Sequence, residues 1–158
     1  MYKRQPQPEP EPALSAEQEA ARIAAIPRRT SPELERSLRD AAAQGGAERC
    51  RELLERGVAV DGADASGFTA LSTAACHGRA ATAALLLRYR AEVARADRRG
   101  MTALHWAASQ QRAAACALLV AAGAPLEARG GAAALTPLLL AAKNQVNYVI
   151  IHPYFTPN

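Results

Sequence analysis

The sequence predicts an all-α fold, a solenoid of stacked helix-turn-helix units connected by short β-turn or hairpin loops. Three observations lead to this prediction. The chain repeats itself at an offset of 33 positions, alanine supplies much of its 49% hydrophobic content, and only 4% of its residues are aromatic. Alanine has the highest helix propensity, and its small side chain lets helix axes approach closely. Such a composition favours thin layers of helices over a sheet sandwich.

Residues 1–30 form a first segment with a composition of its own. Proline occupies positions 6, 8, 10 and 12 among Gln and Glu. A segment of this kind cannot bury enough apolar surface to offset its ordering entropy, so we expect a disordered Pro/Glu-rich stretch. Ser15 and Gln18 have the spacing of a capping box, which predicts a short helix over 15–26 that Pro27 ends.

The repeat begins near residue 31. Asp64-Ala-Ser-Gly-Phe-Thr-Ala-Leu71 is followed 33 positions later by Asp97-Arg-Arg-Gly-Met-Thr-Ala-Leu104, and the alanine pairs at 41–42, 74–75 and 107–108 share the offset. We therefore divide residues 31–142 into units at 31–63, 64–96 and 97–129 and a partial unit at 130–142. One such unit cannot bury both of its faces, so stacking must supply the core.

Each unit carries the residues that a helix-turn-helix requires. Thr69 and Thr102 stand where a hydroxyl can cap the first helix, which then shows Leu and Ala at spacings of three and four. Gly57 and Gly123 suit the left-handed backbone position that ends the second helix.

Three positions depart from this pattern. Arg90 stands where Gly57 and Gly123 stand, and a non-glycine residue there costs about 1 kcal/mol. We expect the edge of the second unit to be the least regular for this reason. Gln111 replaces the glycine between the two helices of the third unit, and one extra residue in the fourth unit places Ala134 at a glycine position.

A period of 33 with a Thr-x-Leu-His turn and paired alanines is typical of ankyrin repeats. The chain resembles that family from about residue 31 to 142, most clearly at Gly100-Met-Thr-Ala-Leu-His-Trp-Ala-Ala108. The resemblance implies a non-catalytic protein–protein interaction module, an adaptor or scaffold. It also implies that Thr102 and His105 make turn hydrogen bonds that join neighbouring units.

The same resemblance implies a binding face on the concave side, formed by the turn tips and the exposed face of the first helices. The corresponding positions are Ala65, Ser66, Phe68, Cys76 and His77 in the second unit, and Arg98, Arg99, Met101, Ser109 and Gln110 in the third. Phe68 and Met101 would be apolar anchors beside Arg98 and Arg99; in the alternative interpretation both pack against adjacent turns. We predict a partner protein with an acidic and partly apolar surface.

A competing interpretation is nucleic-acid or acidic-ligand binding through an arginine-rich edge around the second and third units. Its residues would be Arg88, Arg90, Arg95, Arg98, Arg99 and Arg129. Single-stranded nucleic acid is usually bound with many basic contacts and stacking aromatics, and only Phe68 and Tyr89 lie nearby in the sequence. A net charge of +4 does not choose between the partners, and we favour the protein.

The sequence gives no reason to expect catalytic residues, a cofactor or a metal. Cys76 and His77 are neighbours, but adjacent helical side chains point about 100° apart, and no ligand pair has the close spacing of a zinc site. Cys50 and Cys116 occupy equivalent second-helix positions and are interpreted as buried small apolar residues.

Residues 28–32, Arg-Arg-Thr-Ser-Pro, allow two interpretations. Thr30 or Ser31 would be a phosphorylation site at the start of a helix, where the dipole favours negative charge. We favour the other interpretation, in which Ser31 caps that helix and Pro32 takes its first position.

Three widely spaced cysteines and an N-terminus without an apolar signal core predict a cytoplasmic or nuclear protein. The longest run of low polarity, 113–126, is too short to span a bilayer, so we expect no membrane association. Residues 143–158 depart from the repeat in composition. We expect this atypical tail to be poorly ordered.

Overall fold

The computed structural model describes residues 15–28 and 31–144. Within these ranges the chain forms eight α-helices and no strand, which confirms the all-α prediction. The helices are α1 (Ala16–Ala24), α2 (Pro32–Gln44), α3 (Ala47–Glu55), α4 (Ala70–Cys76), α5 (Ala80–Arg88), α6 (Ala103–Ser109), α7 (Ala113–Ala121) and α8 (Pro137–Lys143). The disorder predicted for residues 1–14 and for the tail from residue 145 onward lies outside the described residues.

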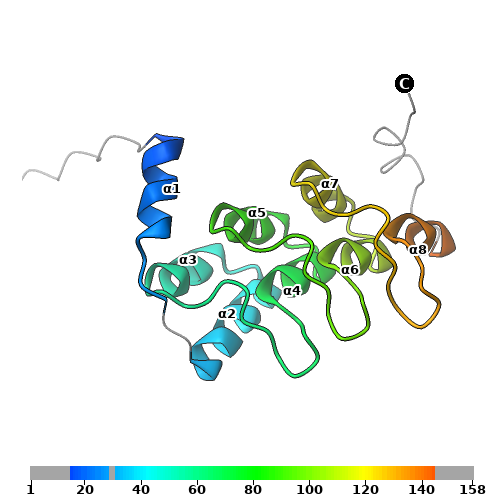
Figure 1. Cartoon of the computed structure of the whole chain (residues 1–158), viewed down its shortest axis with the longest axis horizontal. Helices are drawn as coiled ribbons and strands as arrows, with labels where there is room; N and C mark the ends of the chain where they lie inside the picture. The colour runs from blue at the N-terminus through cyan, green and yellow to red at the C-terminus, as the bar shows by residue number, and fades with distance from the viewer. Residues whose placement is uncertain (1–14, 29–30, 145–158) are drawn as a thin grey trace, which may run out of the picture.

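The repeat helices stack in two layers (Figure 1). The first helices of successive units, α2, α4, α6 and α8, contact one another in sequence order, and the second helices α3, α5 and α7 form the other layer. The loops that lead into α4, α6 and α8 project together from one side of the stack. Isolated bridges between Ala96 and Thr102 and between Gly130 and Leu135 close two of these loops.

The core repeats with the same offset as the sequence. In each of the first three units, one leucine of the first helix is 1% exposed, one leucine of the second helix is 0% exposed, and one alanine of the first helix is 0% exposed. The leucines are Leu38, Leu71 and Leu104, then Leu53, Leu86 and Leu119; the alanines are Ala42, Ala75 and Ala108. Small alanine side chains let the layers approach while the leucines fill the space between units.

The three non-glycine residues at glycine positions adopt the backbone that the register predicts. Their φ angles are +64° at Arg90, +58° at Gln111 and +48° at Ala134. The prediction that the edge of the second unit is irregular is wrong, however. The Ala91 N–H donates to the Leu86 carbonyl at 3.0 Å, as the Val58 N–H donates to the Leu53 carbonyl at 3.2 Å. Closing these terminal hydrogen bonds holds the regular geometry despite the strain at Arg90.

One arginine joins the second unit to the first, and another joins the third unit to the second, which the sequence did not predict. Arg79 Nε donates to the Ala43 carbonyl at 3.1 Å, and Arg112 Nε donates to the Cys76 carbonyl at 3.2 Å. Each side chain lies against the inter-helix glycine of the preceding unit: a Cβ added at Gly78 would lie 2.7 Å from Arg112 Cδ. Unpaired carbonyls at the ends of the first helices thereby receive a donor from the next unit.

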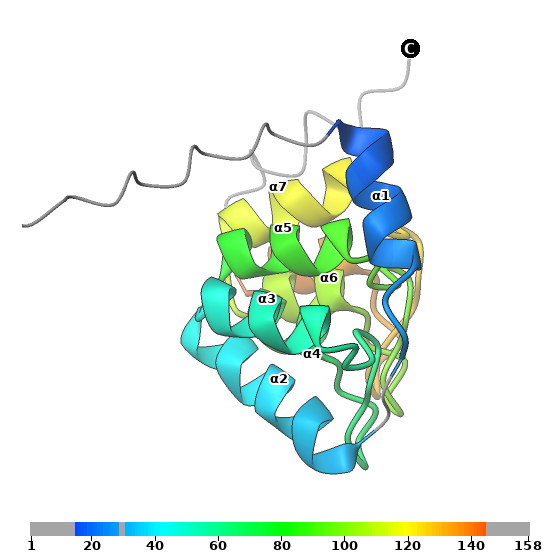
Figure 2. The ribbon, with the colours of Figure 1, turned by 90° about the vertical axis from the view of Figure 1, so that its left-hand side faces the viewer.

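Helix α1 lies against the C-terminal ends of α3 and α5 (Figure 2). Its capping box is present, with the Ser15 side chain accepting from the Gln18 N–H. Arg22 pairs with Glu55 at 3.2 Å, and Glu19 pairs with Arg88. These ion pairs join α1 to the layer of second helices.

Thr82 of α5 gives a first testable prediction. Its hydroxyl is buried and has no hydrogen-bond partner among the described residues. Thr82→Val should raise the free energy of unfolding by about 1 kcal/mol, because an unsatisfied buried hydroxyl is replaced by a methyl group of the same shape. Urea denaturation followed by circular dichroism measures the change. The matched variant Thr73→Val, which removes a hydroxyl that donates to the Thr69 carbonyl, should not stabilise the protein.

Candidate functional site

The site begins with two loops built alike. Asp64 Oδ1 accepts hydrogen bonds from the backbone N–H groups of Ser66 and Phe68, at 2.8 and 2.9 Å. Asp97 Oδ1 accepts from the corresponding N–H groups in the next loop, those of Arg99 and Met101, at the same two distances. An aspartate that binds its own loop in this way fixes a tight turn. The same hydrogen bonds therefore hold the backbone of both tips.

Successive tips are hydrogen-bonded to each other. The Arg98 N–H donates to the Ser66 carbonyl at 3.0 Å, and 33 positions later the Gly131 N–H donates to the Arg99 carbonyl at 2.8 Å. The contact is close, since a Cβ added at Gly67 would lie 2.9 Å from Asp97 Cα. The row of tips is thus held in fixed register before any ligand arrives, which lowers the entropic cost of binding.

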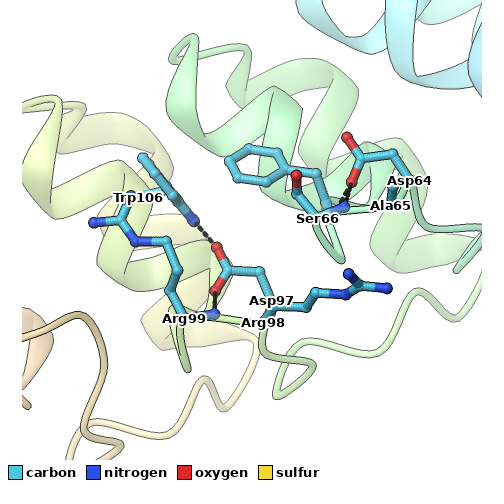
Figure 3. Close-up of a pocket in the computed structure, with 8 residues that line it drawn as sticks. Asp64, Ala65, Ser66, Asp97, Arg98, Arg99 and Trp106 are labelled. Atoms are coloured by element: carbon cyan, nitrogen blue, oxygen red, sulfur yellow. Dashed lines mark hydrogen bonds between the residues drawn. The ribbon is translucent and has the colours of Figure 1, made fainter.

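A pocket of about 510 Å³ lies between the tips of the second and third units and the side of α6 (Figure 3). Phe68 and Trp106 form its aromatic part, with ring centroids 4.8 Å apart and planes tilted by 58°. The Arg99 guanidinium lies 5.7 Å from the Trp106 ring centroid, and the indole N–H donates to Asp97 Oδ2 at 3.0 Å. Aromatic side chains beside arginine are typical of the energetic centres of protein interfaces.

The structure brings five of the ten predicted binding residues together in this pocket. They are Ala65, Ser66, Phe68, Arg98 and Arg99. Phe68 is half-buried and the other four are exposed. The expectation that Phe68 stands on a tip beside the two arginines agrees with this geometry.

The prediction for Met101 is wrong. We predicted an exposed anchor, but its side chain is 5% exposed. Its sulfur would lie 3.5 Å from a Cβ added at Gly131, because the loop of the fourth unit covers it. The alternative interpretation, packing against the adjacent turn, is the correct one for this residue, whereas Phe68 remains accessible.

The remaining four predicted residues lie at the C-terminal ends of α4 and α6, outside the pocket: Cys76, His77, Ser109 and Gln110. His77 Nδ1 lies 2.9 Å from the Thr73 carbonyl of its own helix. The Ser109 hydroxyl donates to the Trp106 carbonyl at 3.0 Å. Two of these side chains are therefore occupied by local contacts.

Sequence reasoning missed Trp106, the residue that completes the pocket. Ser109 and Gln110 were assigned to the exposed face of the first helix, and residues three and four positions earlier lie on the same face of a helix. Trp106 stands at that spacing and is the single tryptophan of the chain. Helical periodicity applied back from Ser109 and Gln110 identifies it.

His105 joins the third and fourth units, as the resemblance implied. The Thr102 backbone N–H donates to His105 Nδ1 at 3.1 Å, which leaves the proton on Nε2, and Nε2 donates to the Leu135 carbonyl at 3.0 Å. The side chain is 0% exposed. Burial lowers the pKa of His105 below its ordinary value, although the carbonyl of Leu135 acts in the opposite direction. A proton on Nδ1 would point at the Thr102 N–H group, so two donors would face each other and the hydrogen bond would be lost.

This arrangement predicts a pH dependence of stability. Below about pH 6.5 the histidine of the unfolded chain gains a proton, while His105 of the folded protein, whose pKa is lowered by burial, takes up a proton only at lower pH. The unfolded state then binds more protons than the folded state. The free energy of unfolding therefore decreases as the pH is lowered, by up to about 1.4 kcal/mol per pH unit. Urea denaturation at pH 7.5 and 5.5 measures it. The decrease should be smaller in His105→Gln and unchanged in His77→Gln; an equal decrease in all three proteins would contradict the assignment.

Two of the three cysteines are buried in the core of the stack. Cys50 and Cys116 are 0% and 1% exposed, and burial raises the pKa of each thiol to about 11, so both are the buried small residues predicted. Among residues 15–28 and 31–144, no three His, Cys, Asp or Glu side chains are grouped to hold a metal ion.

Two further sequence predictions concern the start of α2 and the basic edge. Ser31 stands at the N-cap of α2 and Pro32 at its start, but the Ser31 side chain makes no capping hydrogen bond. Thr30 lies outside the described residues. In the arginine-rich edge, Arg88 pairs with Glu19 of α1. No helix in the described part of the chain has the length and apolar character needed to cross a membrane.

The comparisons with known proteins agree with this architecture. A family model described as ankyrin repeats, in three copies, matches residues 38–129. Comparison with curated proteins found none that matches the chain. Ankyrin repeats are generally protein–protein interaction modules and are typically non-catalytic. The match covers more than half of the 158 residues and coincides with the stacked units, and the chain therefore belongs to the ankyrin-repeat family.

Proposed function

We propose that this protein is an adaptor or scaffold that binds a partner protein at its concave face, through the tips of the second and third units and the adjoining side of α6. The observation that supports this proposal is the pocket formed by Phe68, Trp106 and Arg99. Its side chains come from two units whose tips are hydrogen-bonded in fixed register. Its volume falls within the usual range for ligand sites, about 300–1,000 Å³.

Two cations on this face are available to a partner. Arg98 and Arg99 are exposed, and neither side chain pairs with a carboxylate in the described part of the chain. Arginine presents five N–H donors in a planar fork that suits carboxylates. The site thus combines apolar rings with unused donors for an acidic group, and the partner surface that fits it is acidic and partly apolar.

Affinity capture tests the proposal. The tagged protein and an Arg98→Glu/Arg99→Glu variant are incubated with an extract of cells that express the protein, and the bound proteins are identified by mass spectrometry. The control, Arg51→Glu/Arg56→Glu, makes the same change of charge on α3 and at its C-cap. We expect a specific protein to be lost from the tip variant and retained by the control. Identical recovery by all three forms would place the binding surface elsewhere.

A further inference from the structure

We infer that the concave face has a second apolar subsite beside the first, and that the two subsites together take one acidic segment of a partner in polyproline II conformation, with two apolar side chains three positions apart. This inference rests on the proposed function, because it specifies the chain that binds at the same face. It concerns the chemistry of the partner and not the location of the face.

The second subsite is a pocket of about 210 Å³ between the tips of the third and fourth units. Most of its lining is apolar: Leu135 and Leu140 are partly exposed, Met101 is buried, and the alanines at 132 and 133 are exposed. The larger pocket, with Phe68 and Trp106, lies one unit earlier. Arg99 lines both pockets, so the two adjoin with a single cation between them.

The spacing of the subsites matches a polyproline II segment. The pockets lie one unit apart, and packed helix axes are about 8–10 Å apart. A polyproline II segment rises about 3.1 Å per residue with three residues per turn, so residues three positions apart lie about 9 Å apart on the same side. In a β-strand, residues three positions apart point to opposite faces. A polyproline II segment can therefore place one apolar side chain in each pocket.

The charges along the face select an acidic segment. Arg98 lies at the first pocket, Arg99 between the two and Lys143 at the second, and none of the three pairs with a carboxylate among the described residues. The aspartates of the first pocket are already engaged. Asp64 accepts two backbone N–H groups, and Asp97 accepts two and the indole of Trp106. The N–H donors of the three cations are therefore available to the carboxylates of a partner.

Fluorescence anisotropy with the protein and labelled synthetic peptides tests the inference. The probe is Glu-Pro-Phe-Glu-Pro-Leu-Glu-Glu, whose Phe and Leu are three positions apart. One control, Glu-Pro-Phe-Glu-Leu-Pro-Glu-Glu, has the same composition and charge with the apolar residues two positions apart. A second control replaces Leu of the probe with Ser. We expect saturable binding of the probe and about tenfold or greater weakening with either control, the loss of one well-placed anchor.

The protein variants separate this inference from the proposed function. Arg98→Glu/Arg99→Glu should abolish binding of the probe, and Arg51→Glu/Arg56→Glu should leave it unchanged. Equal binding of all three peptides, or of a single-stranded oligothymidylate, would overturn the inference and leave only attraction between opposite charges. If the probe does not bind while capture of a cellular partner still requires Arg98 and Arg99, the inference is wrong and the proposed function stands.

Discussion

Leu104→Ala is expected to lower the free energy of unfolding by about 2–5 kcal/mol, the range for large-to-small changes in a packed core. Leu104 is 1% exposed and lies on α6, which packs against α4, α7 and α8. A cavity there removes contacts within the third unit and with both of its neighbours. Because each unit of a solenoid depends on adjacent units for its core, we expect the loss to weaken the whole stack.

Urea denaturation followed by circular dichroism measures this effect, and the chain offers a matched control. Leu139 is 51% exposed, so Leu139→Ala makes the same chemical change at the surface and should alter stability by no more than about 0.5 kcal/mol. Equal losses from the two substitutions would contradict the packing described for α6.

The second large effect is expected at the tips. Gly67 has φ +86°, and a Cβ there would lie 2.9 Å from Asp97 Cα and 3.0 Å from the Arg98 nitrogen. Gly67→Ala therefore combines backbone strain with a collision against backbone that cannot turn away. We expect a loss of about 2–4 kcal/mol, the sum of left-handed strain and overpacking. The hydrogen bond between Arg98 and Ser66 should break as the tips separate.

Gly123 separates the two causes. Its φ is +82°, but a Cβ there would meet nothing within 4 Å, so Gly123→Ala should cost about 1–2 kcal/mol from strain alone. Chemical denaturation compares the two variants, and hydrogen exchange of the Arg98 amide shows whether the tips have parted. If both variants lose the same stability and that amide stays protected, the tips are not held together as closely as the structure indicates.

The periodic features could be predicted because they depend on local register. An offset of 33 aligned the buried leucines, and it also placed Arg90, Gln111 and Ala134 at positions where all three have positive φ. The backbone conformation of a short turn is set by its neighbours in sequence, and the next unit repeats it. The role of His105 followed from the same register, since its partner carbonyl lies 30 positions ahead in the adjacent unit.

The site was predicted in part. The residues of the two tips were predicted to lie together because they share one loop pattern. The prediction that Met101 is exposed was wrong, and Trp106 was not predicted. Met101 occupies the same repeat position as Phe68. The longer loop of the fourth unit buries Met101, whereas Phe68 stays accessible. Repeat periodicity predicts the same exposure for equivalent positions, but the adjacent unit decides how exposed each side chain is.

The sequence by itself determined the class of fold, the period of the stack and the buried leucine and alanine positions. These follow from helical spacing and turn chemistry, which act over a few residues. The tertiary structure alone decided that α1 lies against α3 and α5 through Glu19 and Arg22, that Arg79 and Arg112 join successive units, and that Trp106 meets Phe68. Those contacts join residues from different units or segments, and the side-chain geometry that selects them exists only once the units have stacked.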